Sequence, residues 1–318
     1  MEALWQTYQH LEDPVKRCFS YCKGFIDSDG EEELEDVGRQ YFDELVSSAF
    51  LEEQPPTNYF AIPDLVHDLA VQVAGGQCLC IQRGWIGALM QDVRHLFIEA
   101  DGAENIGMIL ELTELQTLII TYTGPCREML VEEIFESVFT RLPNLRVLIL
   151  KVENMHRPWG KTIFIPESIG RLKLLRYFAF VGCQRSTVLK WPSTFVQLYH
   201  LEVLDVGRST DLLFFSCNDL SKLIKLRHVI ADGKDSDWAY IGKLESLRTF
   251  EHFTVKKGEG YELCQLKQLN KLRGKLSIYG LENVSSQEDA LDAELHRKEN
   301  LKEVKLTWDG KRETSDEE

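Results

Sequence analysis

The sequence lacks any long hydrophobic run. No apolar stretch reaches the roughly 18 to 20 residues that a membrane-spanning helix needs. The opening MEALWQTYQH has neither the basic region nor the apolar core of a secretory signal. We therefore expect a cytoplasmic protein with no membrane span.

Cysteine is also sparse. Eight cysteines in 318 residues are too few for a disulfide scaffold, and a cytosolic chain keeps them reduced. Cys18 with Cys22 and Cys78 with Cys80 form close pairs, but no second pair or histidine pair stands at ligand spacing. We expect no metal site, and we interpret the cysteines as small buried hydrophobic residues.

Basic residues are outnumbered, with 36 Lys and Arg against 51 Asp and Glu and a net charge of −15. This balance argues against binding to a nucleic-acid backbone as the main activity. Residues 1–60 hold 14 acidic and 4 basic side chains, a net charge of −10, so a short segment supplies most of the imbalance. The uneven charge indicates two parts of different character.

Catalytic motifs are missing as well. The eight histidines are scattered, no G-x-S-x-G occurs, and no Ser/His/Asp or Cys/His arrangement has motif support. No G-x-x-x-x-G-K-[ST] phosphate loop occurs in the 318 residues. The sequence predicts no enzyme and no cofactor.

What the sequence does contain is a repeat, which begins near residue 93. Each copy reads apolar-x-x-apolar-x-x-apolar-x-apolar, as in Leu142-x-x-Leu145-x-x-Leu148-x-Leu150. This is the leucine-rich-repeat signature. The second leucines of six copies are 30, 30, 26, 25 and 21 residues apart, at Leu115, Leu145, Leu175, Leu201, Leu226 and Leu247.

A single repeat cannot bury its own leucines, so the copies must stack. The predicted fold class is α/β: a leucine-rich-repeat solenoid with a curved parallel sheet on its concave side. The stretch CREMLVEEIFESVFTRL has helical periodicity and predicts a helical return. Ile165-Pro166 and Trp191-Pro192 open returns in which proline favours an extended or 3₁₀ conformation.

Helices precede the repeats. Asp13-Pro14 is typical of a helix start, with Val15, Cys18, Phe19 and Cys22 on one face. A second helix has the apolar stripe Leu34, Val37, Tyr41, Leu45 and Val46. A third starts near Pro63-Asp64, with Leu65, Leu69, Ala70 and Val73 predicted inward, and ends at Gly75-Gly76.

Four segments follow one another in a recognisable order: Lys16-Arg-Cys18-Phe19-Ser-Tyr21-Cys22, the Leu34–Leu45 helix, Asp64-Leu-Val-His67-Asp68-Leu69-Ala70 and the Arg273–Val284 stretch. Together they resemble plant nucleotide-binding leucine-rich-repeat (NLR) immune receptors of the coiled-coil class. The first two are similar to that family's winged-helix part, and the last two to family segments before and inside the repeats. The resemblance covers nearly the whole chain and implies a defence role.

The resemblance also identifies what is missing. The family binds ADP or ATP through a phosphate loop, which is absent here, and about twenty residues of the winged helix are absent after Cys22. In the family a Met-His-Asp triplet contacts the bound diphosphate; Ile62-Pro63-Asp64 stands in its place, so Asp64 is the only remnant of a cofactor site. Proline cannot supply the hydrogen bond of an imidazole ring.

Partner-binding candidates come from strand alternation, which points every second side chain into the concave face. The alternation gives Tyr177, Val181, Asp205, His228, Asp232, Glu251 and Phe253. The same alternation points further residues such as Val147 and Ile149 into this face, and for these there is a second interpretation, in which the N-terminal helices cover them.

We therefore expect a truncated member of this family with four segments: a winged-helix remnant over 1–76, a linker over 77–92, the solenoid over 93–308 and a charged tail over 309–318. Its function would be to recognise or dock proteins: a pathogen effector, a guarded host protein or the nucleotide module of a receptor. One alternative is part of a nucleotide-switched receptor whose phosphate-loop half is encoded upstream. The other is a non-functional gene fragment.

Overall fold

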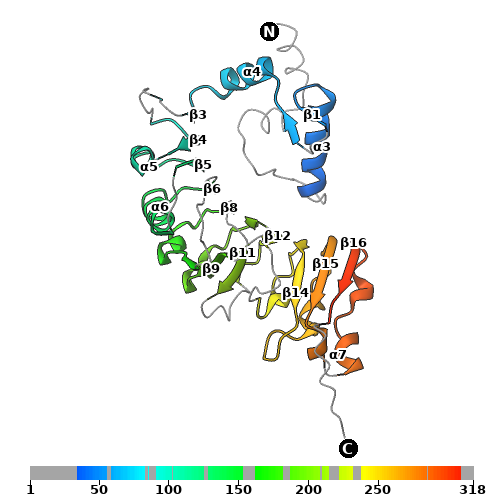
Figure 1. The fold of residues 1–318 in the computed structure, drawn as a ribbon. Coiled ribbons are helices and arrows are strands. Elements are labelled where there is room, and N and C mark those ends of the chain that lie inside the picture. Colours follow the sequence, from blue (N-terminus) through cyan, green and yellow to red (C-terminus); the bar gives the residue numbers. More distant parts are fainter. Residues whose placement is uncertain are drawn as a thin grey trace, which may run out of the picture. The chain divides into compact units, whose positions relative to one another are not determined.

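The computed structural model describes residues 34–55, 59–82, 85, 91–101, 103–124, 128–152, 162–181, 187–207, 210–214, 222–231, 238–284 and 286–308. The chain divides into two compact units, residues 1–80 with 87–96 and residues 81–86 with 97–318 (Figure 1). The helix predicted after Pro14, the candidate Asp232 and the tail over 309–318 lie outside the described residues.

The first unit contains α3 (Leu34–Ser47), the antiparallel pair β1 (Glu52–Gln54) and β2 (Tyr59–Ala61), α4 (Asp64–Ala74) and β3 (Cys78–Ile81). Its core joins both helices, because Leu45 of α3 and Val66 and Leu69 of α4 are buried together with Phe50. The prediction for α4 was wrong at one position: Leu65 is 59% exposed, whereas its neighbour Val66 faces the core. Strand β3 lies within the segment that we expected to be a linker.

The second unit is built on parallel strands, one for each repeat, as the repeat spacing predicts. The main sheet has the order β13-β12-β10-β8-β6-β5-β4. Its strands are β4 (His95–Ala100), β5 (Thr117–Tyr122), β6 (Val147–Val152), β8 (Tyr177–Val181), β10 (Val203–Gly207), β12 (His228–Ala231) and β13 (Thr249–Phe250). A three-stranded parallel sheet continues the series with β14 (His252–Thr254), β15 (Gly274–Tyr279) and β16 (Leu301–Leu306).

The return segments differ between repeats. Early returns are the helices α5 (Ala103–Ile109) and α6 (Glu128–Arg141), and α6 confirms the predicted helical return. The strands β7 (Thr162–Phe164), β9 (Thr187–Trp191) and β11 (Thr210–Phe214) form a second parallel sheet. Short 3₁₀ helices follow the two prolines, at η1 (Glu167–Arg171) and η2 (Ser193–Gln197), as predicted.

Later returns are short. They consist of η4 (Ile241–Lys243), η5 (Leu263–Leu266), η6 (Leu281–Asn283), α7 (Gln287–Leu291) and η7 (Leu295–Arg297). At the last described strand, β16, Val304, Leu306 and Trp308 are 43%, 46% and 59% exposed. Within the described residues, no helix has both the length and the apolar character needed to cross a membrane.

The core of the second unit lies between the main sheet and the returns. The six leucines that set the repeat spacing, Leu115 to Leu247, are all 0% exposed. Aromatic rings fill the space beneath α6, where Phe135 lies 5.8 Å from Phe178 and 5.4 Å from Phe180 between ring centroids. Trp191 of the next return packs on Phe178 at 5.4 Å. Stacked repeats therefore share one continuous core on one face of the main sheet. The side chains of the opposite face point away from that core.

Candidate functional site

The candidate site is the open sheet face, which we define as the side chains of the main sheet that point away from the leucine core. Strand register aligns them in rows across the repeats. One row runs along Thr117, Val147, Tyr177, Val203, His228 and Thr249. A second row runs along Ile119, Ile149, Ala179, Asp205 and Ile230.

Tyr177 and Asp205 form the polar centre of this face, on the adjacent strands β8 and β10. Burial, and then the negative charge of Asp205, raise the pKa of the Tyr177 phenol. The phenol is therefore a neutral hydrogen-bonding group at physiological pH. The Asp205 carboxylate oxygen Oδ1 accepts a hydrogen bond of 2.9 Å from the amide of Gly207, where the register of β10 shifts.

His228 extends the polar centre towards the later repeats. Its Nδ1 lies 3.0 Å from the Thr249 hydroxyl on β13, so a hydrogen bond joins two repeats on the open sheet face. Tyr177, Val181, Asp205 and His228 are all half-buried. Their backbones are fixed by the strand ladder, so the face presents aromatic, acidic and imidazole groups at set positions.

Two partner-binding candidates, Glu251 and Phe253, lie where β13 ends and β14 begins. Glu251 is half-buried in the one-residue gap between the strands. Phe253 is only 2% exposed and pairs with the core residue Ile278, so the prediction that it faces outward was wrong. Glu251 adds one residue to the strand, so the core positions are Phe250 and Phe253, three residues apart instead of two.

The same shift brings in a residue that the sequence prediction missed. His252 takes the outward position instead of Phe253, and its Nδ1 lies 3.4 Å from the Tyr279 hydroxyl on β15. The two rings are 5.8 Å apart between centroids. The spacing Phe250-x-x-Phe253 is the only sequence signal for this exchange.

The remnant of the nucleotide site has no comparable geometry. Asp64 is an exposed residue in the first turn of α4, and Pro63 before it makes no side-chain cap. His67 lies 3.8 Å from Asp68, but both side chains are strongly exposed, at 64% and 71%. Among the described residues, no group of three or more His, Cys, Asp or Glu side chains is arranged to hold a metal ion.

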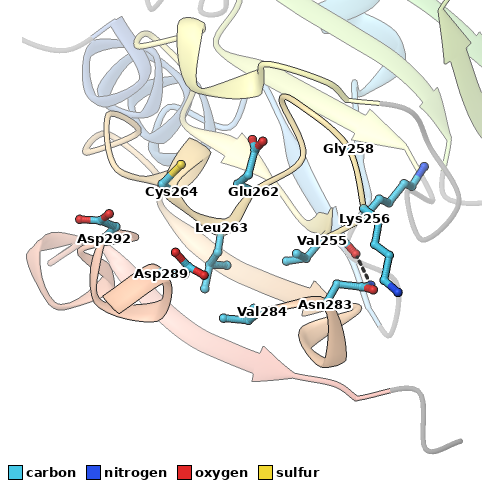
Figure 2. A pocket seen from close by; sticks show the side chains of 11 residues that line it. Val255, Lys256, Gly258, Glu262, Leu263, Cys264, Asn283, Val284, Asp289 and Asp292 are labelled. Carbon is cyan, nitrogen blue, oxygen red and sulfur yellow. Dashed lines mark hydrogen bonds between the residues drawn. The ribbon is translucent and has the colours of Figure 1, made fainter. Parts of the chain in front are cut away.

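A pocket of about 520 Å³ opens among the later returns. Figure 2 shows Lys256 at one end and Asp289 and Asp292 at the other. In the lining of the pocket, the Asn283 side-chain amide donates a hydrogen bond of 3.0 Å to the Val255 carbonyl oxygen. Burial, and then the charges of nearby acids beginning with Glu262, raise the pKa of the Cys264 thiol in this pocket. A thiol that stays protonated is a poor nucleophile, so the pocket gives no support for covalent catalysis.

Comparison with known proteins agrees with both units. A family model described as Disease resistance protein Winged helix domain matches residues 21–70, and one described as R13L1/DRL21 LRRs matches residues 263–318. RGA4 of Solanum bulbocastanum is 30% identical over 338 residues, covering 97% of this chain and 30% of that protein. The disease resistance protein RGA2 of the same plant is 30% identical over 336 residues, with the same two coverages.

Among solved structures, the leucine-rich-repeat ectodomain of the receptor kinase GASSHO1/SCHENGEN3 from Arabidopsis thaliana is similar. The identity is 16% and the TM-score is 0.37, and the match covers 68% of this chain and 30% of that one.

The chain spans about 30% of the length of the two Solanum relatives. Together, the winged-helix match, the repeat match and these relatives support a plant protein of the NLR type, similar to disease resistance proteins over 97% of this chain.

Proposed function

We propose that this part of an NLR protein serves plant defence as a protein-interaction module, and that it recognises or docks its partner on the open sheet face. The observation that carries the proposal is the fixed row of Tyr177, Val203, His228 and Thr249 beside Asp205. Mixed aromatic, apolar and charged side chains on a rigid backbone are typical of protein-binding surfaces.

The mode of action is docking without catalysis and without a nucleotide switch within these 318 residues. The lack of a phosphate-loop motif in the sequence and the exposed position of Asp64 support this part of the proposal. The partner is a pathogen effector, a guarded host protein or the nucleotide module of a receptor. A cytoplasmic location remains a prediction.

A second candidate function is favoured by the winged-helix match over residues 21–70. In that case the chain works as part of a nucleotide-switched receptor whose phosphate loop is encoded upstream. Calorimetry separates the two for the chain itself: we expect no saturable binding of ADP or ATP with magnesium. A micromolar isotherm would instead establish a nucleotide site in these residues.

The docking proposal is tested by affinity capture from leaf extract with the unmodified chain, Tyr177→Asp and His228→Asp. The matched control is Tyr199→Asp, because Tyr199 is 44% exposed after η2, away from the two rows. We expect specific partners to be lost with the first two variants and kept with the control. The same partners on all four chains would overturn the proposal.

A further inference from the structure

A pair of surface residues recurs in a tight turn just before the repeat strands. The amide of the leucine after each pair donates to the carbonyl oxygen of the residue before it, at 3.0 Å for Leu175 to Leu172 and 2.9 Å for Leu201 to Leu198. Each pair therefore occupies the two central positions of a β-turn. In chain order, the pairs are Thr113-Glu114, Pro143-Asn144, Lys173-Leu174, Tyr199-His200, Ile224-Lys225, Glu245-Ser246, Asn270-Lys271 and Glu299-Asn300.

Three consecutive turns combine a large exposed apolar side chain with a lysine or a histidine. Their apolar residues Leu174, Tyr199 and Ile224 are 41%, 44% and 63% exposed. These turns precede β8, β10 and β12, which are adjacent strands of the main sheet and lie about 4.8 Å apart. The turns on either side, Pro143-Asn144 and Glu245-Ser246, hold neither a large apolar residue nor a basic one. We call the six residues of the three turns the apolar turn patch.

Side-chain contacts join the three turns. The Lys173 ammonium group donates to Gln197 Oε1 at 2.7 Å and lies 5.5 Å from the centre of the Tyr199 ring. Lys225 Nζ lies 3.2 Å from His200 Nδ1. Burial, and then the charges of Lys225 and Arg176, lower the pKa of His200, so its imidazole is neutral at physiological pH and accepts this bond. Among the described residues, both ammonium groups thus bond to neutral acceptors and neither forms an ion pair with a carboxylate.

This composition suits contact with a membrane. Apolar side chains that project from turns can enter the boundary between lipid headgroups and acyl chains. Tyrosine is favoured at that depth, because one end of its ring is apolar and the other is polar. Lysine buries its methylene chain there and keeps the ammonium group among the headgroup phosphates. Each lysine close to an anionic membrane strengthens the attraction.

We propose that the apolar turn patch docks on an anionic membrane surface. Leu174, Tyr199 and Ile224 insert between the lipids, and the two lysines contact lipid phosphates. A lipid surface suits the patch better than a folded protein, because it deforms around three projecting turns, whereas a protein would need a hollow shaped to each of them. The net charge of −15 disfavours contact through the acidic parts of the chain and so favours this orientation. The inference does not rest on the proposed function, since the turns precede the strands that carry the open sheet face.

Vesicle flotation at low salt tests the inference. The probe is a vesicle of phosphatidylcholine with about 30% phosphatidylserine, and a vesicle of phosphatidylcholine alone is the probe control. We expect the unmodified chain to bind the anionic vesicle saturably and the neutral one weakly. Ile224→Asn should bind about tenfold more weakly, because it removes inserted apolar surface. Lys225→Gln should bind about fivefold more weakly.

The chain itself offers matched controls. Ile224→Asn gives its turn the same pair as Asn270-Lys271, which the solenoid already accommodates, so the variant guards against loss of folding. Lys271→Gln removes an exposed lysine from the second position of a turn that has no large apolar residue. It should bind the anionic vesicle as the unmodified chain does.

Tyr199→Asp separates the two surfaces: it should lose vesicle binding but keep the proteins that are captured through the open sheet face. If those proteins are still lost with Tyr177→Asp while no vesicle binds, only this inference has failed. Equal binding to both vesicles, or equal losses from Lys225→Gln and Lys271→Gln, would also overturn it. So would tighter patch-dependent binding of a soluble amphipathic peptide of leucine and glutamate, which would make the patch a site for a protein.

Discussion

The amide of Phe50 donates a hydrogen bond of 2.8 Å to the carbonyl oxygen of Leu45, and the two side chains are buried in the same cluster. Ala49 between them donates to Val46 at 3.0 Å and has a φ of 58°. This pair of bonds is the Schellman ending of a helix, here α3. Its left-handed residue is usually glycine, since a Cβ makes that conformation costly.

Ala49→Gly should therefore stabilise the first unit. Relief of the left-handed strain outweighs the added flexibility of the unfolded chain, and we expect a gain of about 0.5 to 1 kcal/mol. Hydrogen exchange of the α3 and α4 amides measures this, because it reports the first unit separately. Ala49→Val is the matched control and should speed exchange; slower exchange in Ala49→Val than in Ala49→Gly would contradict the assignment.

Close stacking of the later returns depends on Gly242. A Cβ at this position would lie 2.6 Å from the backbone carbonyl oxygen of Gln265 in the next return. Gly242→Ala must push η4 and η5 apart, and we expect a loss of about 1 to 3 kcal/mol in chemical denaturation. Gly107→Ala is the matched control, since nothing lies within 4 Å of a Cβ there and α5 gains helix propensity. Similar stabilities for the two variants would argue against tight stacking.

Much of the fold could be predicted because the leucines recur at the same position of each repeat and are buried in every one. Leu115 to Leu247 are buried as expected, and α6, η1 and η2 stand where periodicity and proline placed them. Strand alternation predicted that Tyr177, Asp205 and His228 point away from the leucine core. Successive side chains of a strand point to opposite faces of the sheet, so the buried leucines determine which residues lie on the open sheet face.

The predictions were wrong where the identity or number of single residues changes which side chains of a strand or helix face the core. Glu251 interrupts the alternation, so Phe253 enters the core and His252 leaves it. In α4, Leu65 and Val66 are both apolar, and only the packing against Leu45 and Phe50 decides which is buried.

The Tyr177 pKa offers a direct measurement on the candidate site. The Tyr177 phenol should titrate above the ordinary tyrosine value of about 10, because burial and the charge of Asp205 both disfavour the phenolate. Asp205→Asn should lower this pKa but leave it raised, since burial is the larger cause. Carbon-13 tyrosine NMR follows the titration, with Tyr177→Phe identifying the signal. A Tyr177 pKa that is unmoved by Asp205→Asn would contradict the pairing.

Lys298 gives a pH dependence of stability. Its side chain is 4% exposed, its Nζ donates to the Leu269 carbonyl at 3.3 Å, and burial lowers its pKa despite the opposing charge of Glu294. Between that lowered pKa and the ordinary value of about 10.4, the unfolded chain binds more protons than the folded one. The contribution of Lys298 to stability therefore grows as the pH rises through this window.

Lys298→Met removes the buried ammonium group, so its free energy of unfolding should rise less with pH than that of the unmodified chain. Urea denaturation at several pH values up to about 10 measures the difference, and the effects of all other groups cancel between the two proteins. Lys302→Met on β16 is the control, because Lys302 is exposed and should leave the slope unchanged. Equal slopes for Lys298→Met and the unmodified chain would show that the ammonium remains hydrated in the folded state.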